Sequence, residues 1–156
     1  MRAFNAVGIF CDDVREDKGG HTIIGTLPDN MIVNTVPGTL PKLAIYIRIH
    51  LDPTAEIRAV SSKLRFPDNS EVPLSSFEAP QIKKLQADAR EKGTPYVGII
   101  SMAVAALFQI PAAGRILAIA EINGEEIICA ALNIEEQPTS SATASAPLAS
   151  QSLTAS

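Results

Sequence analysis

The sequence predicts an all-β, mainly antiparallel sandwich of about seven strands with one short helix, and three observations support this prediction. Asn123-Gly124 lies between two runs of alternating apolar residues. That is the strongest short-range signal of a hairpin, because both central residues of its tight turn take a positive φ. From Leu43 to Leu51 every second residue is Leu or Ile, and Ala44, Tyr46, Arg48 and His50 stand between them, as in a strand with one buried face. The turn tripeptide Pro-Asp-Asn occurs at residues 28–30 and again at 67–69.

The expected elements follow in order along the chain. Strands are expected at about residues 3–14, 21–33, 43–51, 56–66, 96–110, 116–122 and 127–134, with the second strand interrupted at residues 28–30. The helix is expected at about residues 80–92. Pro80 suits its first turn, and Ile82, Leu85 and Ala89 form one apolar stripe. Gly93 and Pro95 then stop the helix.

Two segments divide the chain, a β-sandwich domain over residues 1–136 and a tail over residues 137–156. The tail contains six Ser, five Ala, three Thr and two Pro, and it has no charged or aromatic residue. Such a composition buries too little apolar surface to offset the entropy lost on ordering. We therefore expect a disordered Ser/Ala/Thr-rich tail.

Composition limits the classes of function. The net charge of −4 gives no general electrostatic reason to bind nucleic acid or an anionic membrane. Two cysteines make no disulfide framework, and we expect no cofactor and a reducing, cytoplasmic location. The uncharged apolar run at residues 97–108 is too short for a helix to span a bilayer, so a buried strand is expected there. The apolar N-terminus has Asp12-Asp13 where a signal peptide would be cleaved, which favours a first strand.

Several short islands carry a resemblance to a known family. They are Cys11-Asp12-Asp13-Val14-Arg15, Gly19-Gly20 with Ile24-Gly25, Leu40-Pro41-Lys42-Leu43, and Gly114-Arg115 with Asn123-Gly124-Glu125. Together they resemble an uncharacterised bacterial domain family with Ig-like β-sandwich character. The resemblance covers most of residues 1–136 and none of the tail. It implies an Ig-like β-sandwich, and it implies no activity, because function lies in sites placed on folds.

The densest group of reactive residue types lies near the end of the first strand. Asp12, Asp13 and Asp17 offer hard carboxylate oxygens to a calcium ion, although such a site takes six to eight oxygens. Cys11 and His21 are the candidate thiol and base, but the neighbouring aspartates would oppose a thiolate. The competing interpretation is a charged hairpin loop whose signs alternate, and we favour it. No residue is assigned a catalytic role.

A second candidate is a basic face on the third and fourth predicted strands. Tyr46, Arg48 and His50 share the polar face of one strand, and Lys63 and Arg65 would lie alongside if the two strands pair. Such a face suits an acidic protein partner, but the competing interpretation is a solvated sheet face with ordinary charges, and we favour it. One tyrosine is too few for a stacking platform and no phosphate-binding motif accompanies it, so nucleic acid is not expected.

The strand expected at residues 96–110 is apolar on both faces, so each face needs a cover. One face meets the core. The short helix or a second subunit would cover the other, and we expect a second subunit because the three apolar positions of the helix are too few to shield the strand. Its residues are Ile100, Met102, Val104 and Phe108. We therefore expect a non-enzymatic binding or assembly module that forms a homo-oligomer. The alternatives are a structural component of a larger particle, such as a virion or a secretion assembly, and a metal or thiol site around residues 11–21.

Overall fold

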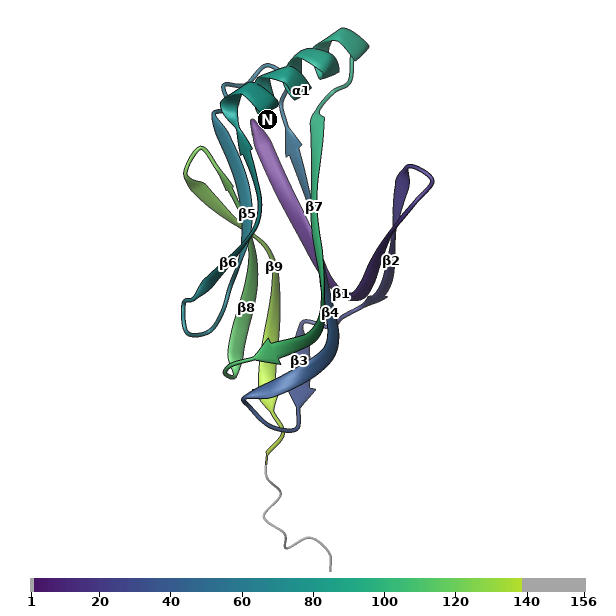
Figure 1. The fold of residues 1–156 in the computed structure, drawn as a ribbon. Coiled ribbons are helices and arrows are strands. Elements are labelled where there is room, and N and C mark those ends of the chain that lie inside the picture. The colour runs from purple at the N-terminus through teal and green to yellow at the C-terminus, as the bar shows by residue number, and fades with distance from the viewer. Residues whose placement is uncertain (1, 139–156) are drawn as a thin grey trace, which may run out of the picture.

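The computed structural model describes residues 2–138, which form two facing sheets and one helix (Figure 1). The strand order is β2-β1-β4-β7 in a four-stranded sheet and β3-β9-β8-β5-β6 in a five-stranded sheet. All pairs are antiparallel except β3 with β9. The elements are β1 (Phe4–Asp17), β2 (Gly20–Thr26), β3 (Asn30–Val33), β4 (Gly38–Leu51), β5 (Ala59–Arg65), β6 (Glu71–Glu78), α1 (Ala79–Lys92), β7 (Val97–Ile110), β8 (Gly114–Ile122) and β9 (Glu125–Glu136).

The prediction of a mainly antiparallel β-sandwich with one helix is confirmed, with two differences in the strands. The second predicted strand is two strands, β2 and β3, which lie in different sheets. Pro28 and Asp29 form the turn that separates them. Strand β6 was not predicted. It carries Pro73, which a strand tolerates only at a sheet edge, and its sequence shows no alternation. The predicted tail lies outside the described residues except for Gln137 and Pro138.

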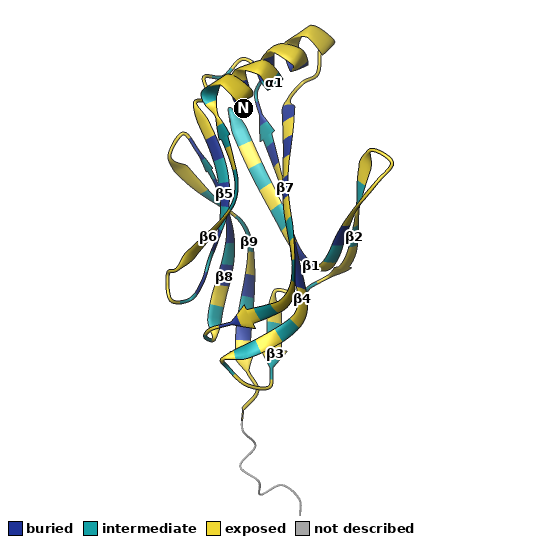
Figure 2. Ribbon diagram, in the orientation of Figure 1, coloured by how far each residue is buried: buried dark blue, intermediate teal, exposed yellow. Residues whose placement is uncertain are grey.

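The core between the sheets is aliphatic, as the composition predicts. Figure 2 shows buried and exposed residues alternating along the strands. The side chains with almost no exposed surface come from both sheets, among them Ile47, Ile49, Leu51, Ile116, Ile122, Leu132 and Ile134. Helix α1 lies across one end of the sandwich and buries Ile82 in the same core. Within residues 2–138, no helix is long and apolar enough to cross a membrane.

The hairpin of β1 and β2 projects from the four-stranded sheet (Figure 1). Strand β1 pairs with β4 only as far as Cys11, opposite Ala44, and its remaining residues pair with β2. Residues 12–26 are here named the arm, and a small second core joins them to β4. In it Val14 packs with Cys11 and Ala44, and Ile23 and Tyr46 pack against them. The arm therefore lies at the β2–β1 side of the sheet, and β7 lies at the opposite side.

Strands β4 and β7 change face together near Leu107. Leu107 has a φ of 51°, which breaks the alternation of β7, and the register places it opposite Pro41 on β4. Beyond this point Leu40 and Phe108, which are paired, both pack against the main core. The ring of Phe108 stacks on Phe66 of the five-stranded sheet, with centroids 5.8 Å apart. The prediction that Phe108 shares an outer face with Ile100, Met102 and Val104 is therefore wrong.

Candidate functional site

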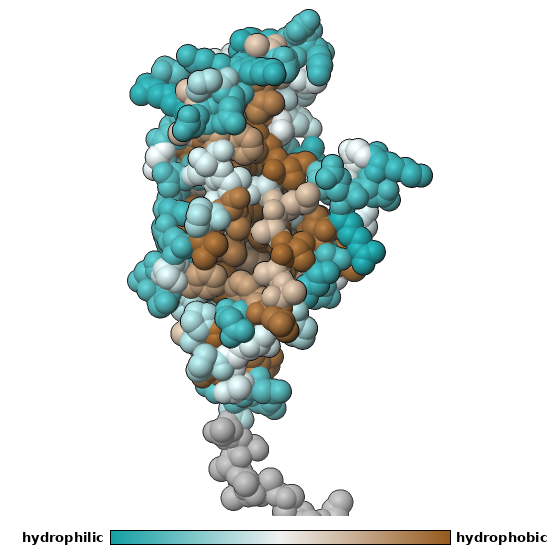
Figure 3. All heavy atoms as spheres, in the orientation of Figure 1, coloured by the Kyte–Doolittle hydropathy of each residue, from teal (hydrophilic) through white to brown (hydrophobic). Residues whose placement is uncertain are grey.

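The outer face of the four-stranded sheet, on the side away from the core, is largely apolar. Ile100, Met102 and Val104 of β7 are 38%, 38% and 44% exposed, and Val7 of β1 is 61% exposed. The register places Ile9, Tyr46 and Met102 in one row across β1, β4 and β7, and it places Val7, Arg48 and Ile100 in the next row. In Figure 3, hydrophobic surface gathers around β7 and between β7 and the arm. Single exposed apolar side chains are normal, whereas a contiguous apolar stripe is a candidate interaction surface.

Within residues 2–138, strand β7 also leaves half of its backbone polar groups unpaired. Phe4 pairs with Leu51, and one step further the amide of Asp52 donates to the carbonyl of Ala3 over 2.8 Å. In an antiparallel ladder, hydrogen-bonded pairs alternate with non-bonded pairs. Because Asp52 is in a bonded pair with β1, the even-numbered residues of β4 direct their N–H and C=O groups toward β1. The odd-numbered residues of β4 direct theirs toward β7. The odd-numbered residues of β7 lie opposite these odd-numbered residues of β4. The even-numbered residues of β7 therefore direct their backbone groups at the free edge: Gly98, Ile100, Met102, Val104 and Ala106.

This free edge lacks the devices that usually prevent strands from pairing with other chains. Natural edge strands are short, charged or interrupted by proline. Strand β3 has only four residues. Strand β6 carries Pro73, and Glu71 and Glu78 stand at its two ends. Strand β7 has 14 residues with no charge and no proline, and the sequence has no charge between Lys92 and Arg115. Its edge and its outer stripe, Ile100, Met102 and Val104, are here named the β7 surface.

The predicted basic face does not form as one surface. Tyr46, Arg48 and His50 do lie on the outer side of β4. Lys63 and Arg65 are on β5, in the other sheet, because β4 pairs with β1 and β7 and not with β5. The alternation of β5 places its polar residues on a sheet face, as predicted, but nothing in the sequence states which strands are neighbours.

Lys63 and Arg65 instead belong to a network of ion pairs on the five-stranded sheet. The Lys63 Nζ lies 2.8 Å from Glu126 and 3.2 Å from Glu71. The Arg65 guanidinium contacts the same two carboxylates at 2.7 Å, and Glu121 lies 3.3 Å from Lys63. Hydrogen bonds from Arg65 and Lys63 lower the pKa of Glu126 to about 2, and they lower the pKa of Glu71. These carboxylates raise the pKa of Lys63 and of Arg65. Cations paired so closely within the chain leave little charge for an acidic partner.

The three candidate metal ligands do not converge. Asp13 accepts from Arg15 and Lys42, each at 2.9 Å, and these hydrogen bonds lower its pKa. Asp12 lies beside Gly25, where the Cβ of any other residue would come within 2.3 Å of its carboxylate oxygen, and Asp17 is at the end of β1. Among residues 2–138, no group of three His, Cys, Asp or Glu side chains has a geometry that would hold a metal ion. Strands β1 and β2 form a hairpin, and charges of both signs lie near its turn.

Cys11 and His21 do not form a nucleophile and base. Cys11 pairs with Thr26, whereas His21 pairs with Glu16, five residues further along β1, and its ring lies 5.6 Å from that of Tyr46. Cys11 has no exposed surface, and burial raises the pKa of its thiol. A buried thiol with a raised pKa is a poor nucleophile. Both Cys11 and Cys129 are unpaired in the structure.

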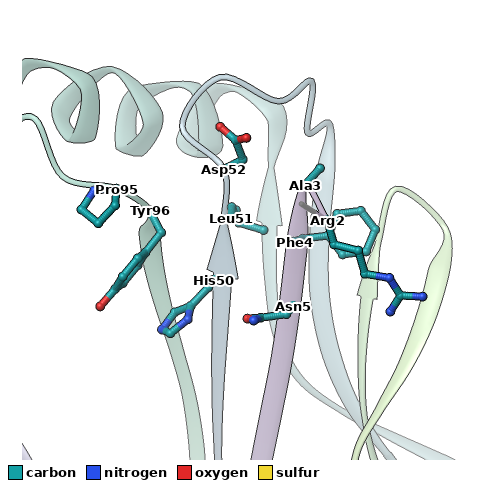
Figure 4. Close-up of a pocket in the computed structure, with 9 residues that line it drawn as sticks. All are labelled: Arg2, Ala3, Phe4, Asn5, His50, Leu51, Asp52, Pro95 and Tyr96. Atoms are coloured by element: carbon teal, nitrogen blue, oxygen red, sulfur yellow. The ribbon is translucent and has the colours of Figure 1, made fainter.

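A hollow of about 280 Å³ lies at the helix end of the four-stranded sheet (Figure 4). His50 and Tyr96 stand side by side in it, with ring centroids 4.2 Å apart and planes inclined by 29°. The Nε2 atom of His50 is buried and has no hydrogen-bond partner in the part of the chain that the structure describes. Burial, with a smaller effect of Arg48, lowers the pKa of His50, so its ring is neutral at neutral pH. Asn5 lies opposite His50 in the register of β1 and β4, and its amide supplies no charge that would activate the ring for proton transfer.

Comparison with known proteins assigns the chain to a family. The model of a family of unknown function (DUF6941) matches residues 6–135. The chain belongs to the DUF6941 family. No curated protein and no solved structure matched the chain. The predicted membership of an uncharacterised domain family is thereby confirmed. The match does not bear on an Ig-like character or a bacterial origin, which stay predictions.

The DUF6941 match spans the whole of β4 and β7 and therefore includes the β7 surface. Sequence reasoning found Ile100, Met102 and Val104 from the two-faced apolar pattern. It missed Tyr96, which precedes β7 and has no patterned neighbour, and the change of face at Leu107. A positive φ at leucine has no sequence signal, since this conformation favours Gly, Asn and Asp.

Proposed function

We propose that this DUF6941 domain is a non-enzymatic assembly module that associates with a second copy of itself through the β7 surface. The observation that carries the proposal is that β7 has both unpaired backbone groups and exposed apolar side chains within residues 2–138. The backbone groups of Ile100, Met102 and Val104 face a free edge, and their side chains form an exposed apolar stripe. A second strand beside β7 would satisfy both, because main-chain hydrogen bonds give affinity and adjacent side chains bury apolar area.

The charge distribution favours a second copy as the occupant. A two-fold axis brings each residue near it close to its own copy, so any charge there would face a like charge. The 14 residues of β7 carry none. An acidic or basic partner would gain no ion pair along this edge. The two unpaired cysteines suit a reducing compartment, and we propose a cytoplasmic location for the same reason.

A comparison of two lysine variants tests this function. In Met102→Lys the ammonium reaches solvent in a single copy, because Met102 is 38% exposed. Beside a second β7 the substitution removes an apolar neighbour and brings two ammonium groups together near the two-fold axis, which disfavours the dimer. Ile128→Lys is the matched control, since Ile128 is 62% exposed on β9 in the other sheet. In sedimentation velocity at micromolar concentration, we expect the unmodified chain and Ile128→Lys to be dimers and Met102→Lys to be a folded monomer. An unmodified chain that sediments as a monomer at every concentration would refute the proposal.

A further inference from the structure

Resting on the proposed self-association, we infer that the two β7 strands pair antiparallel about a two-fold axis at Met102. This pairing joins the two four-stranded sheets into one continuous sheet. The inference specifies the partner surface, the strand direction and the register, which the proposed function leaves open.

The direction follows from symmetry and the register from the backbone. Two identical strands side by side about a two-fold axis perpendicular to the sheet run antiparallel. Bonded pairs then draw on residues whose N–H and C=O groups face the edge, which are the even-numbered residues from Gly98 to Ala106. With Met102 opposite its own copy, Ile100 pairs with Val104 of the second copy, and Gly98 pairs with Ala106. Every outward-directed residue has a partner. A shift of the register by two residues would leave the outward-directed residue at one end of the strand without a pairing partner.

The local conformation limits how far the pairing extends. At one end the positive φ of Leu107 turns β7 toward the core. At the other end Pro95 precedes the strand and has no N–H to donate. The regular part of the edge therefore runs from Val97, the first residue of β7, to Ala106, and Met102 is the middle one of its five outward-directed residues.

The side chains in this register are compatible on both faces. On the outer face, the stripe of Ile100, Met102 and Val104 meets the same stripe in reverse order, so apolar side chains adjoin across the axis. On the inner face, Ser101 and Ala103 lie opposite each other's copies and are small enough for two strands to approach. The arm packs on Ala44 and Tyr46 of β4, and its strand β2 pairs with β1 at the side of the sheet away from the free edge of β7. Helix α1 lies across the end of the sandwich and not along this edge (Figure 1).

Disulfide cross-linking between copies tests the register. We would use a Cys11→Ala, Cys129→Ala background that has the sedimentation coefficient of the unmodified chain. In that background Met102→Cys should form a disulfide-linked dimer on mild oxidation, because residue 102 lies opposite its own copy at a distance of about 5.5 Å between Cα atoms. Val104→Cys alone should not, because its copy lies four residues along the strand, about 13 Å away. An equal mixture of Ile100→Cys and Val104→Cys should give the mixed disulfide.

The outcomes separate this inference from the proposed function. A dimer in sedimentation that cross-links through Val104→Cys alone, or through none of these positions, would overturn the register and keep the self-association. A chain that sediments as a monomer would overturn both. Cross-linking at Met102→Cys together with the mixed Ile100→Cys and Val104→Cys product, and not at Val104→Cys alone, supports the inference.

Discussion

The hydroxyl oxygens of Ser62 on β5 and Ser101 on β7 lie 2.6 Å apart, so a hydrogen bond joins the two sheets inside an apolar core. Ser62 also lies 2.7 Å from Ser75 on β6, and Ser62 and Ser101 are almost completely buried. Buried hydroxyls need partners, and here each supplies the other's. The chain of three hydroxyls holds β7 against the five-stranded sheet and leaves its outer stripe directed away from the core.

Replacing Ser101 tests this link between the sheets. Ser101→Ala should lower the free energy of unfolding by about 1 kcal/mol, because one buried hydrogen bond is lost while Ser62 keeps Ser75 as a partner. Urea denaturation measures the change. In a Ser75→Ala background Ser101→Ala should cost more, because Ser62 is then left unsatisfied. Equal costs in both backgrounds would contradict the link.

Asn123 should stabilise the fold through the hydrogen bonds of its side chain as well as through its turn conformation. Its side chain accepts from the amide of Arg58 at 2.7 Å and donates to the carbonyl of Glu56 at 2.9 Å, which fastens the segment before β5 to the β8–β9 hairpin. Asn123→Gly keeps the backbone at a φ of 52° but loses these bonds, whereas Asn123→Ala loses the bonds and also strains the backbone. We expect thermal unfolding to rank the unmodified chain above Asn123→Gly, and Asn123→Gly above Asn123→Ala. A glycine variant as stable as the unmodified chain would show that the side-chain bonds contribute nothing.

Local sequence patterns predicted most of the strands and the helix. They also predicted the apolar stripe of the β7 surface but not its free edge. Asn123-Gly124, the alternation through β4 and the stop signals after α1 are short-range features, and each has one preferred structure. Strand neighbours are set by long-range packing, so Lys63 and Arg65 were placed beside Tyr46 although they lie in the other sheet. The sequence likewise did not indicate that one edge of β7 is free within residues 2–138. An apolar strand indicates that both faces need covers, but it does not indicate that β4 is its one neighbour within residues 2–138.

Acid should weaken the ion-pair network of Lys63, Arg65, Glu71 and Glu126. The pKa of Glu126 falls from 4.5 to about 2 on folding, and that of Glu71 also falls. A lowered pKa in the folded state stabilises the fold above the unfolded value, and this contribution is lost as the pH falls from 4.5 toward 2. Urea midpoints at pH 7 and pH 3 should differ more for the unmodified chain than for Glu126→Gln. Identical differences would contradict a role for Glu126.

Proline scanning of β7 should distinguish edge-directed amides from those directed at β4. The amide of Met102 faces the free edge, so Met102→Pro removes no bond to β4, whereas Ala103→Pro removes one. We expect Met102→Pro to be a folded monomer by circular dichroism and sedimentation, and Ala103→Pro to be strongly destabilised. Equal destabilisation by the two prolines would contradict the assigned direction of the backbone groups.

Residue-resolved hydrogen exchange of the β7 amides, measured at several protein concentrations, tests the self-association most directly. The amides of Ile99, Ser101 and Ala103 donate toward β4 and should be protected at every concentration. The amides of Ile100, Met102 and Val104 face the free edge, so they should be protected where the dimer forms and exchange quickly on dilution. Fast exchange of Ile100, Met102 and Val104 at the highest concentration, beside protected odd-numbered neighbours, would show that no second strand covers this edge.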